Sequence, residues 1–190
     1  MGAYSLKLYF EDVWQLLRCN KRRVFLCVFF ALLGIVFGVV LFNTANYNWW
    51  YCNRYEFANM LLYGGFFQIF CSFLISAALC NLLLCLFSMC HWTPILCYPL
   101  IVVFSLYFGA NCAAIFTCVG LVGILYAVLL AVGQTVNLLC CFFVLCVPNC
   151  RRTFREAFCA TKSIFIWQLV SIIFRIAVLF LLLRFLAGKV

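Results

Sequence analysis

The chain has 190 residues, of which 69% are hydrophobic and 9% are charged, and its formal net charge at pH 7 is +9. A chain with this composition has too few polar residues to cover the surface of a water-soluble domain. The composition therefore excludes a soluble globular protein and predicts an integral membrane protein. The basic residues stand mostly at the ends of apolar runs, where they orient the chain and contact anionic membrane lipids, and nucleic acid is therefore not an expected partner.

The N-terminal stretch carries an amphipathic pattern. Residues 4–17 place Leu6, Phe10, Val13 and Leu17 at helical spacing, with charged residues elsewhere on the helix. This pattern predicts a helix that lies on the inner membrane face, or else a cytoplasmic extension of the first span, and the sequence does not separate the two. Acidic residues before the basic cluster are not typical of a cleaved signal peptide.

The first membrane span is expected at residues 24–43, directly after three consecutive basic residues. About twenty apolar residues suffice to cross the hydrocarbon core, and a short basic flank favours the cytoplasmic side. Gly34 and Gly38 stand one helical turn apart and open a strip where the backbone of another helix can approach closely. We therefore expect them in helix packing, although glycine is also common in spans without that role.

Residues 44–65 form the largest segment between apolar runs. They hold four asparagines and a group of aromatic residues around Trp49 and Trp50, together with Arg54. Aromatic rings with a polar edge prefer the level of the lipid headgroups, so we expect an external loop on the outer interface. Trp49, Trp50 and Arg54 are the candidate contacts to an extracellular partner, and an aromatic belt that only anchors the helices explains the pattern equally well.

Three further spans are expected at about residues 66–90, 95–116 and 124–147. A proline fits the first turn of a helix, so Pro94 predicts a short inner turn before the third span. The uncharged run from the third span onward is too long for one helix and about right for two. Glycines within residues 120–123 mark the expected turn between them.

The last apolar segment, residues 164–187, is expected to be a fifth span that leaves the C-terminus outside. It contains Arg175, which is costly near the centre of a bilayer, and no acidic residue lies within a span to pair with it. Either Arg175 snorkels at the inner interface, or it faces the bundle and meets the amides of Gln134 and Asn137. The first explanation is favoured.

The chemistry-bearing residues do not indicate an enzyme, a metal site or a cofactor. The spans contain no Asp or Glu, and there is no histidine cluster and no glycine-rich phosphate loop. Most of the 15 cysteines lie in the expected spans without paired spacing, where cysteine acts as a small hydrophobic residue. Intramembrane polar residues worth testing are Asn111, Gln134, Asn137 and Arg175, for which helix packing is favoured over a transport role.

Four features recur in an order found in a known family. The paired glycines of residues 34–38 follow a basic run, and Pro94 follows the second span, with Thr93 in place of the usual glycine. Residues 133–137 then form a Gln/Asn element, and the basic segment 151–155 precedes the last apolar run. In this order the chain resembles the stage II sporulation protein M family of endospore-forming bacteria, which are small membrane proteins with about five spans.

This resemblance implies a non-catalytic membrane scaffold that works in engulfment of the forespore. Family members recruit two peptidoglycan-degrading partners, stage II sporulation proteins D and P, to the septal membrane of the mother cell. We thus expect one all-α domain over residues 1–190, a polytopic helical bundle with about five spans and a cytoplasmic N-terminus. The sequence leaves open whether copies form a homo-oligomer. The alternative function is a membrane subunit of a transporter, in which Asn111, Gln134, Asn137 and Arg175 line a cavity.

Overall fold

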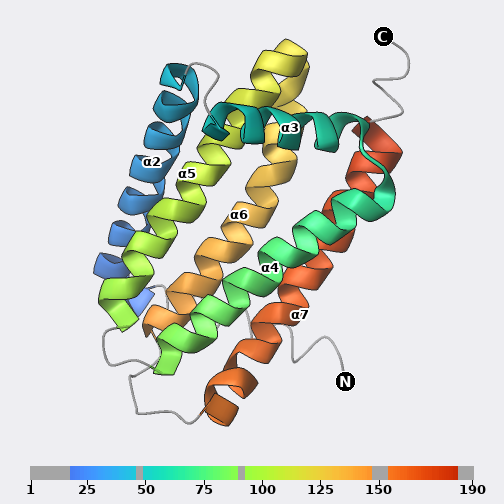
Figure 1. Cartoon of the computed structure of the whole chain (residues 1–190). Helices are drawn as coiled ribbons and strands as arrows, with labels where there is room; N and C mark the ends of the chain where they lie inside the picture. Colours follow the sequence, from blue (N-terminus) through green and yellow to red (C-terminus); the bar gives the residue numbers. More distant parts are fainter. Residues whose placement is uncertain (1–17, 46–48, 90–92, 147–153, 184–190) are drawn as a thin grey trace.

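A computed structural model describes residues 18–45, 49–89, 93–146 and 154–183, and the described elements are helices (Figure 1). The expected helix over residues 4–17 lies outside them. The elements in chain order are α2 (Lys21–Thr44), α3 (Trp49–Tyr63), α4 (Phe66–Met89), α5 (Thr93–Val119), the 3₁₀ turn η1 (Gly120–Val122), α6 (Gly123–Cys146), α7 (Phe154–Val178) and the π-helical turn η2 (Leu179–Leu183).

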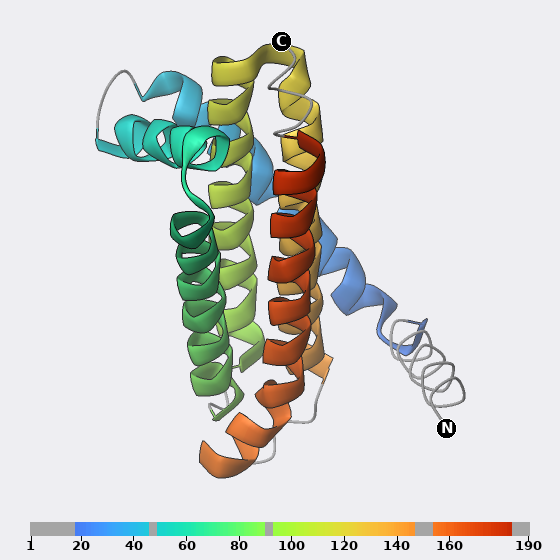
Figure 2. The same cartoon turned by 90° about the vertical axis from the view of Figure 1, so that its right-hand side faces the viewer.

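Within the described residues, five long helices form the bundle and a shorter one lies across its end. Helices α2, α4, α5, α6 and α7 stand side by side, and each runs in the direction opposite to the long helix before it (Figure 1). Helix α3 lies across the end where α2 finishes and where η1 joins α5 to α6, as the view in Figure 2 also shows. Arg23 at the start of α2 donates a hydrogen bond from Nη1 to the carbonyl oxygen of Leu145 near the end of α6, at 2.8 Å.

The outside of the bundle is apolar, as a surface in contact with lipid has to be. On α2, Phe25 is 70% exposed and Val36 is 61% exposed. Three described stretches are long and apolar enough to cross a membrane, namely Lys21–Thr44, Phe66–Phe87 and Leu96–Phe142, and the last of these covers most of α5 and α6. The prediction of an all-helical membrane bundle is therefore confirmed.

The turns of the bundle follow the glycine and proline signals. Helix α5 begins at Thr93, so Pro94 stands in its first turn as predicted. Gly120 has a φ of 63°, a left-handed conformation that favours glycine, and it ends α5 where the turn was expected. Helix α7 begins at Phe154, ten residues before the expected start of the last span, and the apolar stretch of α7 and η2 runs from Phe165 to Leu181.

The expected external loop is a helix. Helix α3 occupies most of residues 44–65, and Ala58 and Leu61 on its inner face are completely buried. Phe42 at the end of α2 stacks on Tyr51 at the start of α3, with 4.8 Å between ring centres. The asparagines and aromatics of this segment indicated a loop, but the burial of one helical face against the bundle stabilises a helix there.

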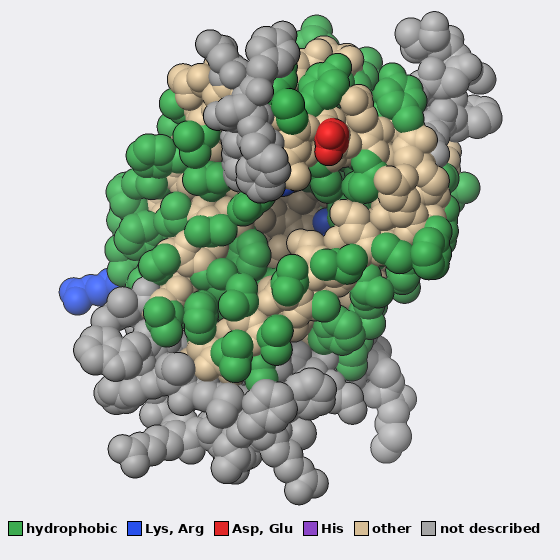
Figure 3. Space-filling model, viewed as in Figure 1, with side chains coloured by type: hydrophobic (Ala, Val, Ile, Leu, Met, Phe, Trp, Pro, Cys, Tyr) green, Lys and Arg blue, Asp and Glu red, His purple; other side chains and the backbone are tan. Residues whose placement is uncertain are grey.

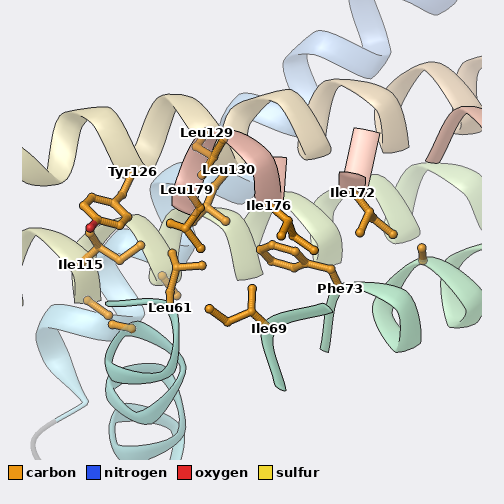
Figure 4. Close-up of a cluster of buried hydrophobic side chains, with 14 of the residues drawn as sticks. Leu61, Ile69, Phe73, Ile115, Tyr126, Leu129, Leu130, Ile172, Ile176 and Leu179 are labelled. Atoms are coloured by element: carbon orange, nitrogen blue, oxygen red, sulfur yellow. The ribbon is translucent and has the colours of Figure 1, made fainter. Parts of the chain in front are cut away.

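Two groups of buried side chains form the core. The group nearer α3 contains Leu61, Phe73, Tyr126, Ile172 and Leu179, drawn from α3, α4, α6, α7 and η2 (Figure 4). The other group contains five of the described cysteines, which are buried: Cys27, Cys80, Cys97, Cys140 and Cys141. Here cysteine fills the core as a small hydrophobic side chain, in agreement with its spacing in the sequence.

Candidate functional site

Helices α2 and α5 approach each other at glycines. A Cβ atom added to Gly34 would lie 2.5 Å from the carbonyl oxygen of Val102, and one added to Gly38 would collide with the backbone of α5. The approach is reciprocal, because a Cβ atom on Gly109 of α5 would collide with the carbonyl oxygen of Ile35 in α2. The two glycines named from the sequence thus lie on the face of α2 that packs against α5.

Arg54 of α3 points into the bundle and holds α3 against α5. Its Nη1 donates a hydrogen bond to Oδ1 of Asn111 at 3.2 Å, and its guanidinium carbon lies 4.8 Å from the centre of the Tyr107 ring. Burial lowers the pKa of the Arg54 guanidinium from its ordinary value. Asn111 therefore connects two helices at this end of the bundle.

This position corrects one of the candidate partner contacts. Arg54 is half-buried and bonded within the bundle, because the helical turn of α3 directs it inward, whereas a loop would have left it outside. The side chains of Trp49 and Trp50 lie outside the described residues. The exposed face of α3 consists instead of Cys52, Tyr55, Glu56 and Tyr63.

Gln134 is buried between α6 and α5. Its Nε2 donates a hydrogen bond to Oγ of Ser105 at 2.9 Å, and only 9% of Gln134 and none of Ser105 is exposed. Ser105 also lies next to Gly34, because a Cβ atom added there would be 2.8 Å from Cβ of Ser105. Gln134 therefore joins the helix pair α5 and α6 beside the close contact with α2.

A chain of amides joins α4, α7 and α6. Asn81 donates from Nδ2 to the Ala77 carbonyl oxygen at 2.9 Å and also to Oε1 of Gln168. Gln168 in turn donates from Nε2 to Oδ1 of Asn137 at 3.0 Å. Gln168 is 2% exposed, so this chain lies in the interior of the bundle.

A polar cavity adjoins this amide chain. Its volume is about 40 Å³. Figure 3 shows the face of Figure 1 hollowed beneath α3, with Lys or Arg atoms in the hollow. Three helices line it: α4 contributes Phe73, Ser76 and Ala77, α6 contributes Gly133, Val136 and Asn137, and α7 contributes Gln168, Ser171 and Arg175.

Arg175 is the charged residue of this cavity among the described side chains. Its guanidinium carbon lies 4.5 Å from the centre of the Phe73 ring, and its Nε donates to the Ser171 carbonyl oxygen at 3.3 Å. It also lies against Gly133, since a Cβ atom added to Gly133 would be 2.5 Å from the guanidinium carbon of Arg175. The absence of a side chain at Gly133 leaves the room that the arginine occupies.

The favoured expectation for Arg175 is wrong. The residue lies in the last turn of α7, near the end that carries α3, and not at the end where α2 and α7 begin. It faces the bundle, as the second explanation supposed, but it shares its cavity with Asn137 and not with Gln134. The cavity proposed for the transporter alternative also changes, because Asn111 and Gln134 lie elsewhere and only two of its four residues remain.

Two polar residues that α7 contributes to the cavity were not singled out from the sequence. Gln168 and Ser171 precede Arg175 at helical spacing, so that all three lie on one face of α7. Polar residues at such intervals in an apolar run are the signal of a buried polar face, and this signal is present in the sequence. The same spacing relates Gly133 to Asn137 on α6.

Comparisons with protein families, with curated proteins and with solved structures found no match to this chain. The resemblance to the sporulation family therefore stays a proposal that rests on the residues quoted for it.

Proposed function

We propose that the chain is a multi-pass protein of the cell membrane and a non-catalytic scaffold. In this proposal it recruits or localises peptidoglycan-degrading partners, similar to stage II sporulation proteins D and P, during engulfment of the forespore. The septal membrane of the mother cell is the corresponding location. No catalytic residue and no cofactor is assigned to it.

The arrangement of charge supports one orientation in the membrane. Lys21, Arg22 and Arg23 stand at the start of α2, and α3 lies across the opposite end of the bundle. Short basic segments stay in the cytoplasm, so α3 belongs on the outer side in this proposal. The alternating long helices then cross the membrane five times.

The observation that carries the proposal is the exposed face of α3. Arg54 and the buried residues Ala58 and Leu61 fix one side of α3 to the bundle. The opposite side presents Glu56 and Tyr63, of which Tyr63 is 82% exposed. A helix fixed across the outer end presents this face in one orientation, which lowers the ordering cost of docking a partner.

The test compares a surface variant with a matched control in cells of the chain's own source during sporulation. We expect affinity purification of the tagged wild-type chain to recover a peptidoglycan hydrolase with an external domain, identified by mass spectrometry. Glu56→Lys combined with Tyr63→Ala should lose it, because the exposed face of α3 is changed. The control Leu32→Ala alters a lipid-facing residue of α2, 59% exposed, and should retain it. Equal recovery with both variants would contradict docking on α3.

A second function is favoured by the polar cavity around Arg175. A transporter subunit needs polar groups in the membrane interior, and Asn137 and Arg175 supply them. This alternative predicts that Asn137→Ala abolishes uptake of a solute at unchanged protein level, whereas Gln68→Ala on the exposed side of α4 does not. Recovery of an ATPase subunit in the purification, in place of a hydrolase, would support it.

A further inference from the structure

We propose that the cavity between α4, α6 and α7 binds one small monovalent anion of halide size, held by Arg175. This site is independent of the scaffold role and of any partner at α3. It follows from three properties of the cavity, which are its uncompensated charge, the direction of its hydrogen bonds and its size.

The charge of Arg175 has no carboxylate to compensate it among the described side chains. A guanidinium stays protonated in proteins, and an unpaired charge within a bilayer is costly. The acidic side chain that the structure does describe, Glu56, lies on the exposed face of α3 and does not line the cavity. An anion beside Arg175 would remove this cost.

The direction of the amide hydrogen bonds is fixed by the backbone. One end of the Asn81 side-chain amide contacts the carbonyl oxygen of Ala77. A carbonyl oxygen only accepts hydrogen bonds, so this end of the amide is the NH₂ group. Gln168 must then accept from Asn81 through Oε1, and its own NH₂ group donates to Oδ1 of Asn137. The amide oxygens of Gln168 and Asn137 are both occupied, and the NH₂ group of Asn137 remains.

Each polar group that remains on the residues of the cavity can therefore donate a hydrogen bond. Arg175 uses Nε for the Ser171 carbonyl oxygen, which leaves its two Nη groups. The hydroxyl of Ser171 has no hydrogen-bond partner among the described residues, although Ser171 is only 7% exposed. The NH₂ group of Asn137 and the hydroxyl of Ser76 are further donors, and all four residues line the cavity. Such a lining attracts an anion and repels a cation.

The size of the cavity selects a small anion. A water molecule needs about 10–15 Å³ of cavity volume. The cavity of about 40 Å³ accommodates a halide ion with a water molecule. Chloride is the abundant anion of this class and bromide is its close analogue.

The experiment measures thermal unfolding of the full chain in detergent while chloride replaces gluconate at constant ionic strength. We expect the Tm to rise and then saturate with chloride, and to respond in the same way to bromide, because a ligand of the folded state stabilises it by mass action. Arg175→Gln should weaken the apparent affinity at least about tenfold or abolish the response. Arg23→Gln, which changes an arginine outside the cavity, should leave it unchanged.

A second variant keeps the proposal testable if Arg175→Gln does not fold. Asn137→Asp retains the oxygen that accepts from Gln168 and places a carboxylate in the cavity with Arg175. We expect a higher Tm in gluconate than for the wild type and no further rise with chloride, because the internal carboxylate replaces the anion. The proposal would be overturned if the Tm of the wild type did not depend on chloride, or if Asn137→Asp retained the full response to chloride. Either result would indicate a cavity that holds water alone.

Discussion

The two sides of the bundle are held together by different means. Helices α2 and α5 meet at Gly34, Gly38 and Gly109, where backbones touch and no side chain intervenes. Helices α4, α6 and α7 meet through Gln168 and its amide partners, beside a cavity that contains Arg175. In lipid, where apolar surface gains nothing by leaving the solvent, close packing and hydrogen bonds are the two available ways to join helices. The glycine contact between α2 and α5 leaves no space, whereas the hydrogen-bonded contact between α4, α6 and α7 leaves a cavity with space for a ligand.

Substitution at the glycine contact is expected to have the largest effect. Gly34→Leu places a side chain where the carbonyl oxygen of Val102 and Cβ of Ser105 already lie, so α2 and α5 must separate. We expect a loss of about 3 kcal/mol or more in the free energy of unfolding, at or above the upper end of the usual cost of overpacking, because the clash includes backbone atoms. The measurement is equilibrium unfolding in mixed detergent micelles.

The matched control for this substitution lies two residues away on the other side of α2. Val36 is 61% exposed, and Val36→Leu adds a methylene group on the lipid-facing surface. It should leave the free energy of unfolding close to that of the wild type. Equal stability of Gly34→Leu and Val36→Leu would show that the glycine contact does not determine how α2 packs.

Removal of the central amide is expected to have an intermediate effect. Gln168→Leu deletes the hydrogen bonds to Asn81 and Asn137 at once, so that Asn81 keeps only its bond to the Ala77 carbonyl oxygen and Oδ1 of Asn137 loses its donor. Hydrogen bonds between membrane helices contribute about 0.6 kcal/mol on average and up to about 1.7, so a loss of about 1–3 kcal/mol is expected for the pair. The same unfolding measurement applies, and Gln68→Leu on the exposed side of α4 is the control. A stability of Gln168→Leu equal to that of the control would remove the amide chain from the interactions that hold α7.

The smallest effect is expected for Gly133→Ala, which is compared with the same substitution at Gly38 on the other side of the bundle. In Gly38→Ala the new methyl group meets backbone, whereas in Gly133→Ala it meets the end of the flexible Arg175 side chain. We expect Gly133→Ala to stay within about 1 kcal/mol of the wild type, because the guanidinium can move and alanine favours the helix by a similar amount. Gly38→Ala should cost more in the same unfolding measurement. Equal losses would mean that the cavity holds Arg175 as rigidly as the backbone of α5 holds α2.

Some local features could be predicted from short stretches of sequence. Pro94 and Gly120 act through their own backbone geometry, so the start of α5 and its end followed from the residue types. The glycines at positions 34 and 38 stand one turn apart and predicted a face for close approach, although the sequence could not name α5 as the helix that approaches. That choice depends on how all the helices are arranged.

Other features depended on contacts between distant segments. The loop expected around Arg54 is the helix α3, because its buried face and the bond to Asn111 exist only once α5 is beside it. The snorkelling expected of Arg175 was wrong for the same reason. An arginine in an apolar run has no evident partner in its own segment, while Gly133 and Phe73 from two other helices make room for it and cover it.

The sequence by itself determined that this protein is a helical membrane bundle, since composition and the length of apolar runs decide which solvent surrounds each residue. Only the tertiary structure decided which polar residues meet. Asn137 joins Gln168 and shares a cavity with Arg175, while Gln134, three residues earlier on the same helix, bonds to Ser105 on another side. Residues that differ by three positions on a helix can contact different neighbours, and only the packing of the helices selects those neighbours.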